Sequence, residues 1–160
     1  MRRPEEREPA FTLPPGATGF HRPQDGPLPE TGLPAFRTAL YAAARAAGGS
    51  VGEVEARAYP RTFHTASVAG RAGESFVLCH AHHPWIAFAA ERRDWYRDEF
   101  LAPPPWSRAF AASGFTVLSG ETLATPLSGV DTSALSPGER RQVRSYAIDT
   151  LGGLLFNAWD

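Results

Sequence analysis

The sequence predicts a single α+β domain in which a small, mainly antiparallel sheet has helices packed on one face, preceded by a flexible N-terminal arm. Three patterns indicate this fold. Residues 34–47 show the apolar spacing of an amphipathic helix, residues 51–83 contain segments that alternate like half-buried strands, and residues 151–158 repeat a helical stripe. A chain of 160 residues with 42% hydrophobic content is long enough to form one core.

Residues 1–33 are expected to form a flexible, proline-rich arm, and residues 34–160 the α+β domain. The arm holds seven of the fifteen prolines, and its few apolar residues follow no period. Such a segment buries too little surface to offset the entropy lost on ordering it. Phe11 and Phe20 are the side chains that could dock on the domain.

The first helix is predicted over residues 34–47, because Pro34 suits a first helical turn and Gly48-Gly49 supplies a stop. Residues 51–59 then alternate small or apolar residues with polar ones, which is typical of a half-buried strand. Residues 62–69 and 74–83 are predicted to pair as a hairpin through a three-residue loop that ends at Gly73.

The second half of the chain has weaker signals. Residues 85–90 and 115–118 are expected to add strands, and a short helix is expected from Trp106 to Gly114. The clearest helix start is Ser136, where a Ser cap, a Pro at the first helical position and a Glu at the third agree with one another.

Composition excludes several kinds of chemistry. All sixteen basic residues are arginine, so a pyridoxal Schiff base, a lysine nucleophile and a P-loop are excluded. The single Cys79 rules out an intramolecular disulfide and a paired-cysteine metal site. A net charge of −1 without a basic patch disfavours nucleic acid. No apolar run reaches membrane-spanning length and no signal peptide is evident, so we expect a cytoplasmic protein with no membrane contact.

The segment Phe76 to Pro84 holds three of the five histidines. If the hairpin loop sets His64 opposite His80, and a tight turn follows Arg57, one face of the sheet gathers imidazole, guanidinium and phenol groups. The predicted ligand-binding residues on this open face are Arg57, Tyr59, His64, His80 and His82. A slip of one residue in the hairpin would instead move His64 to the face opposite His80.

These side chains suit a small anionic ligand better than a metal, because Arg57 would repel a bound cation. We therefore expect no metal and no cofactor. The simplest interpretation is that backbone and water satisfy the histidines at the end of the sheet. At the C-terminus, Leu154, Leu155 and Trp159 are expected to close the core; alternatively, Asn157, Trp159 and Asp160 contribute to a recognition surface.

The leading functional hypothesis is a non-catalytic bacterial accessory or immunity-type binding protein, which recognises a partner protein or small ligand on the open sheet face. The alternative is a small lysine-free isomerase, cyclase or hydrolase that uses His64, His80 and His82 as acid/base groups or metal ligands. Whether the chain is an enzyme therefore stays open. A third hypothesis is a homodimer formed through the uncovered sheet face or through the C-terminal helix.

Overall fold

The computed structural model describes residues 11–159 and confirms the α+β class. Its main element is a five-stranded sheet of order β2-β3-β4-β5-β6. All neighbouring strands are antiparallel except the last pair, which is parallel. The strands are β2 (Ser50–Glu55), β3 (Phe63–Gly70), β4 (Gly73–His80), β5 (Trp85–Ala89) and β6 (Thr116–Val117).

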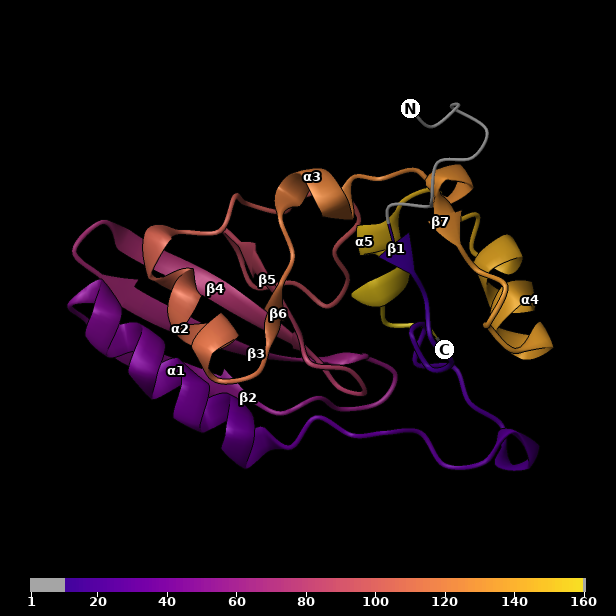
Figure 1. The fold of residues 1–160 in the computed structure, drawn as a ribbon, viewed down its shortest axis with the longest axis horizontal. Coiled ribbons are helices and arrows are strands. Elements are labelled where there is room, and N and C mark those ends of the chain that lie inside the picture. The colour runs from indigo at the N-terminus through magenta and orange to yellow at the C-terminus, as the bar shows by residue number, and fades with distance from the viewer. Residues whose placement is uncertain (1–10, 160) are drawn as a thin grey trace, which may run out of the picture.

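Helices α1 (Leu33–Ala47) and α2 (Arg108–Ala112) pack on the first face of this sheet (Figure 1). The buried face of α1 carries Phe36, Leu40 and several alanines, whose small side chains allow the helix to approach the sheet closely. The apolar partners on the sheet include Ala66, Val77 and Phe88. A short 3₁₀ turn, η3 (Pro105–Ser107), leads into α2.

The second face of the sheet is covered as well. Helices α3 (Gly120–Leu123) and α5 (Leu151–Leu155) share a core cluster with Phe63, Leu78 and Phe156. The side of the sheet that was expected to be open is therefore buried over β3, β4 and β5. The reason is visible in the strands themselves, since β5 is apolar at every position and needs partners on both sides.

A smaller unit lies beside helix α5 (Figure 1). It contains α4 (Pro137–Ser145), the 3₁₀ turn η4 (Leu127–Gly129) and a two-stranded parallel pair. The two strands are β1 (Phe11–Thr12) and β7 (Val130–Asp131). Helix α4 begins with the predicted capping box, in which Ser136 and Glu139 bind each other's backbone amides.

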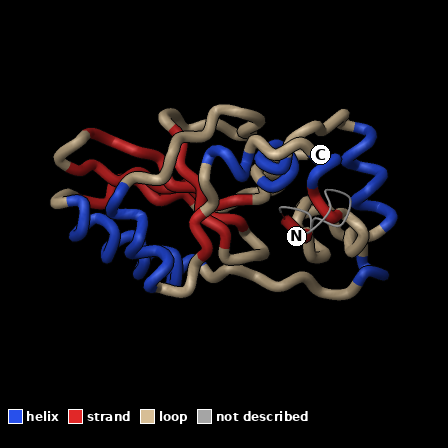
Figure 2. The backbone as a smooth tube through the Cα atoms, turned by 45° about the horizontal axis from the view of Figure 1, so that its top comes forward, coloured by secondary structure: helices blue, strands red, loops and turns tan. Residues whose placement is uncertain are grey.

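Residues 11–32, here called the N-terminal segment, lie against the domain. The segment starts at β1, passes through the 3₁₀ turn η2 (Pro23–Asp25) and returns as a long loop to α1 (Figures 1 and 2). Leu13 and Ala17 are fully buried in the core cluster on the second face of the sheet, and Thr18 is also buried. The remainder of the predicted arm, residues 1–10, lies outside the described residues.

The predicted register of the β3–β4 hairpin is wrong by one residue. Gly70 pairs with Gly73, so the loop has two residues instead of three. His64 consequently faces Cys79, while His80 faces Phe63. The two-residue connection is the commonest hairpin type, and Gly73 adopts the positive φ of 120° that only glycine accepts readily.

The connection between β2 and β3 also differs from the predicted tight turn. Strand β2 ends at Glu55, and residues 56–62 form a loop that contains a cis peptide bond between Tyr59 and Pro60. Arg57 and Tyr59 therefore project from a loop, and both are exposed at its surface.

Candidate functional site

Four of the five histidines bind the backbone of the N-terminal segment. In each of them, one ring nitrogen lies within hydrogen-bond distance of a carbonyl oxygen of that segment. The pairs are His64 Nε2 with Thr31 (3.2 Å), His80 Nε2 with Ala17 (2.9 Å), His82 Nδ1 with Pro29 (2.9 Å) and His83 Nε2 with Pro15 (3.0 Å). Because a carbonyl can only accept, each of these ring nitrogens carries a proton. We call these four residues the histidine clasp.

The second ring nitrogen of two clasp residues accepts from a backbone amide. His64 Nδ1 receives the amide of Arg57 at 2.9 Å. His80 Nδ1 receives the amides of His82 and His83 at 3.1 and 3.2 Å. Since a backbone amide can only donate, both imidazoles must be neutral in this arrangement. A second proton on either ring would point at an amide hydrogen.

Burial disfavours the charged form of three clasp residues, His64, His80 and His82. His80 is completely buried, and the loss of hydration lowers its pKa from 6.5 to about 3. Burial likewise lowers the pKa of His64 and His82. The neighbouring positive charge of Arg57 acts in the same direction on all three rings.

This geometry does not favour acid/base chemistry by the histidines. A general acid or base must reach the proton that it transfers, and His80 has no exposed surface from which to do so. His64 and His80 also lie on opposite faces of the sheet. His80 pairs with Phe63, the residue before His64, and neighbouring residues of a strand point to opposite faces. Within residues 11–159, no group of three or more His, Cys, Asp or Glu side chains is arranged to hold a metal ion.

The five predicted ligand-binding residues are divided among three places. Arg57 and Tyr59 line a pocket at one corner of the domain. His64 and His82 border a smaller hollow of about 180 Å³, which Arg57 also lines. His80 is enclosed between Trp85 and Phe156 and lines neither space. The structure thus brings Arg57 and Tyr59 together and separates them from His80.

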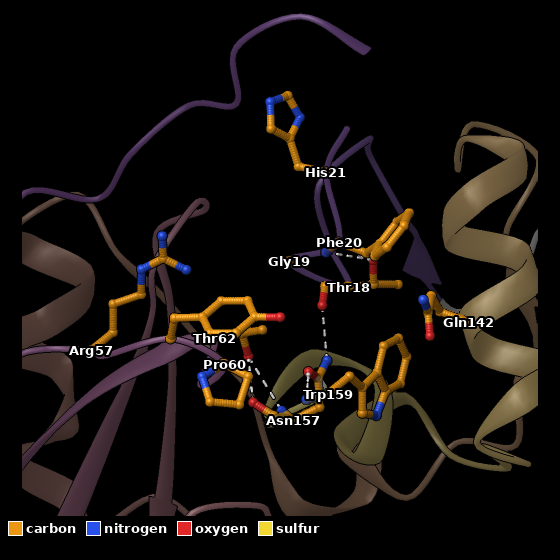
Figure 3. Close-up of a pocket in the computed structure, with 11 residues that line it drawn as sticks. Thr18, Gly19, Phe20, His21, Arg57, Pro60, Thr62, Gln142, Asn157 and Trp159 are labelled. Carbon is orange, nitrogen blue, oxygen red and sulfur yellow. Dashed lines mark hydrogen bonds between the residues drawn. The ribbon is translucent and has the colours of Figure 1, made fainter. Parts of the chain in front are cut away.

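The pocket at Arg57 and Tyr59, here called the corner pocket, has a volume of about 270 Å³. Three parts of the chain form it: the N-terminal segment, the β2–β3 loop and the C-terminal stretch with α4. In Figure 3, Arg57 lies on one side, Trp159 and Gln142 on the other, and Thr62 with Asn157 between them. The lining residues are Thr18, Gly19, Phe20, His21, Arg57, Tyr59, Pro60, Thr62, Gln142, Asn157 and Trp159.

A buried hydrogen-bond network makes the floor of the corner pocket rigid. Asn157 is fully buried, and its side-chain amide donates to the carbonyls of Thr18 (2.9 Å) and Leu154 (2.7 Å). Its side-chain oxygen accepts from the amide of Trp159 at 3.1 Å. The hydroxyl of Thr62 donates to the carbonyl of Leu155 at 2.8 Å. The network joins the N-terminal segment, the β2–β3 loop and the C-terminal stretch at one point (Figure 3).

Arg57 supplies a positive charge to the described lining of the corner pocket. Arg57 and His21 are the ionisable side chains of either sign next to Tyr59, and none of the described lining residues carries a carboxylate. Among residues 11–159, no hydrogen bond or ion pair engages the guanidinium of Arg57. Nearby Arg61 differs, because it is buried and pairs with Glu55 at 2.7 Å and with Asp94 at 3.6 Å. Arg57 is therefore the arginine of this loop that can bind an external anion.

Sequence reasoning missed the contribution of the N-terminal segment to this pocket. Residues 18–21 were assigned to the arm, since nothing local announces that a proline-rich stretch will be bound by distant histidines. Asn157 and Trp159 were recognised as a possible recognition surface because Asn157 is the only asparagine in the chain. Asp160, which was grouped with them, lies outside the described residues.

Comparison of the chain with protein-family models, with curated proteins and with solved structures returned no match. Across residues 11–159, none of the helices combines the length and the apolar character needed to cross a bilayer. The functional argument therefore depends on the geometry of the corner pocket and its surroundings.

Proposed function

We propose that the chain is a non-catalytic binding protein that takes a carboxylate-bearing side chain of a partner protein into the corner pocket. The observation that carries this proposal is Arg57. Its guanidinium has no partner among the described residues, and none of the described residues that line the pocket beside it is acidic. A guanidinium binds a carboxylate through two parallel hydrogen bonds, and this match favours an acidic group over a neutral one.

The exposed aromatic side chain of Tyr59 supports a protein partner. Tyr59 is 78% exposed, more than any other large hydrophobic residue described. Tyrosine and arginine are among the residue types that contribute most to protein–protein binding energy. Tyr59 and Arg57 stand two residues apart on one loop that the Thr62–Asn157 network holds in place. This arrangement is typical of an anchor point on a binding surface.

The size of the pocket favours a side chain over a complete cofactor or metabolite. Pockets for drug-sized ligands usually measure about 300–1,000 Å³ and enclose most of the ligand. The corner pocket is smaller, at about 270 Å³, and opens to solvent beside Tyr59. An aspartate or glutamate side chain fills such a space while its backbone stays outside on the partner.

The test is a titration with N-acetyl-aspartate amide, followed by the NMR shifts of the Gly19 amide and the Trp159 indole. We expect saturable shifts at millimolar concentration. The uncharged N-acetyl-asparagine amide should bind about fivefold more weakly, because it lacks the charge and an exposed ion pair contributes up to about 1 kcal/mol.

Two variants separate the corner pocket from general surface charge. Arg57→Gln should weaken binding of the aspartate derivative about fivefold, whereas Arg45→Gln, on the exposed side of α1, should leave it unchanged. Equal binding of the aspartate and asparagine derivatives, or equal binding by wild type and Arg57→Gln, would exclude the proposed function.

Further features of the hypothesis stay proposals. They are a bacterial accessory or immunity-type role, a cytoplasmic location, the absence of a nucleic-acid partner and a homodimer. The alternative in which His64, His80 and His82 perform chemistry receives no support from their contacts, since each ring N–H binds a carbonyl of the N-terminal segment.

A further inference from the structure

The wall of the corner pocket belongs to the segment that the histidine clasp holds. Thr18, Gly19, Phe20 and His21 line the pocket, and all four lie inside the stretch between the outermost clasp contacts at Pro15 and Thr31. The Ala17 carbonyl bound by His80 immediately precedes this wall. Any change that opens the clasp therefore displaces one side of the pocket.

We propose that the histidine clasp is a proton-operated latch, which releases the N-terminal segment in mild acid and thereby disassembles the corner pocket. The effect on binding rests on the function proposed above; the release of the segment does not. Two clasp residues require neutral rings, because the second nitrogen of His64 and of His80 already accepts backbone amides. A ring that takes up a second proton must lose those bonds and move.

The charged groups around the clasp add to the effect. His80 is within electrostatic range of His82, His83 and Arg57, so a proton that it gains adds positive charge near other basic groups. His64 faces Arg57 and Arg61. A positive charge on any clasp ring is thus repelled by its neighbours.

The carboxylates near the N-terminal segment do not bind the rings of the clasp. Glu30 lies near His82 but is exposed to solvent, which screens its attraction. Glu139 of α4 binds the amides of Gly16 and Thr18 and the hydroxyl of Thr18, and so holds the backbone of the segment rather than the rings. Asp131 of β7 binds Ser133 through its side chain.

The size of the response follows from the protonation of released rings. A released histidine titrates near its ordinary pKa of about 6.5, whereas the held ring of His80 resists protonation to about pH 3. Between pH 7.5 and 5.5 this difference raises the ratio of released to held segment about tenfold for one ring. His64 and His82 shift in the same direction and increase the factor.

Amide hydrogen exchange on the full chain tests the release directly. Protection factors, which correct for the pH dependence of exchange itself, should fall at least tenfold from pH 7.5 to 5.5 at Leu13 and Thr31. Amides of the β3–β4 pairs around Thr65 and Leu78 should change much less. Unchanged protection of the segment, or parallel loss in segment and sheet, would overturn the latch.

Two variants sharpen this test. His64→Gln combined with His82→Asn keeps a neutral N–H donor near each carbonyl but removes two titrating rings, so the pH step should shrink. His21→Gln removes the histidine that is outside the clasp, and the exchange step should persist unchanged. Should the double variant be too unstable to measure, His82→Asn alone must still reduce the step; no reduction would contradict the latch.

The binding consequence is measured with N-acetyl-aspartate amide at the same two pH values. Its carboxyl group, with an ordinary pKa of about 3.9, stays ionised at pH 5.5. The latch predicts weaker binding at pH 5.5 than at pH 7.5. Stronger or equal binding at pH 5.5 would contradict it. Failure to bind at pH 7.5 would remove the proposed function and leave the exchange result to decide the latch.

Discussion

Asn157 shows how much a single residue contributes to joining distant parts of this chain. Its side chain contacts the N-terminal segment at Thr18 and the C-terminal stretch at Leu154 and Trp159, and its backbone contacts Thr62 of the β2–β3 loop. Asn157 is the only asparagine in the sequence, but its partners could not be predicted from the sequence. Two of them, Thr18 and Thr62, are separated from it by long stretches of chain.

We predict that Asn157→Ala lowers the free energy of unfolding by about 3 kcal/mol, because buried carbonyl and amide groups lose their partners at about 1–3 kcal/mol each. Urea unfolding followed by circular dichroism measures this change. Gln142→Ala is the matched control, since Gln142 is an amide side chain of the same pocket that is only half-buried. The account fails at this residue if both substitutions have equal effects.

Cys79 is predicted to be chemically inert in the native protein. It is fully buried between α1 and the sheet, and burial raises the pKa of its thiol far above the usual range. A thiol reagent such as dithionitrobenzoate at pH 8 should react with less than about a tenth of the protein in minutes, and completely in denaturant. Rapid stoichiometric reaction of the native protein would show that the thiol is accessible.

At the scale of elements, most helices and strands could be predicted because their signals are local. The apolar spacing of residues 34–47, the alternation after residue 51 and the Ser136 cap each correspond to an observed element. The hairpin register could not be fixed in the same way. A loop that is one residue longer moves every side chain of the paired strand to the other face. The sequence is compatible with both a two-residue and a three-residue loop.

The start of α4 provides a test at this scale. Glu139 accepts bonds from Gly16, Thr18 and Ser136, so it both caps the helix and anchors the N-terminal segment. We predict that Glu139→Gln costs about 3 kcal/mol of stability, because an amide donor would meet buried donors. Ser136→Ala should cost only about 1 kcal/mol, the usual value of a helix cap. Equal losses in thermal or urea unfolding would show that Glu139 acts only as a cap.

At the scale of the whole molecule, the covered second face is the largest departure from expectation. Residues 119–135 look irregular in sequence, yet Leu123, Val130 and Leu135 fill the core cluster on that face. Their spacing follows neither a helical nor a strand period, so no pattern could have shown that they are buried together. Residues 95–100 and the chain from residue 118 onward, with the N-terminal segment, enclose the side of the sheet that contains His80.

Global stability should therefore decrease in mild acid. The pKa of His80 is lower in the folded chain, about 3, than in the unfolded one, about 6.5, so the unfolded state binds more protons below pH 6.5. From pH 7.5 to 5.5 this ring alone removes about 1.4 kcal/mol, and the loss continues until the pH approaches the folded pKa. Urea midpoints at the two pH values measure the change; a midpoint that rises in acid would contradict it.

The central claim is that the histidines fasten the N-terminal segment, which leaves recognition to the corner pocket. Its most direct test is the ¹⁵N NMR spectrum of the histidine side chains at pH 7.5. We predict neutral rings with the proton on Nε2 in His64 and His80 and on Nδ1 in His82. Charged rings, or mobile rings that exchange between tautomers at His64, His80 and His82, would contradict the account.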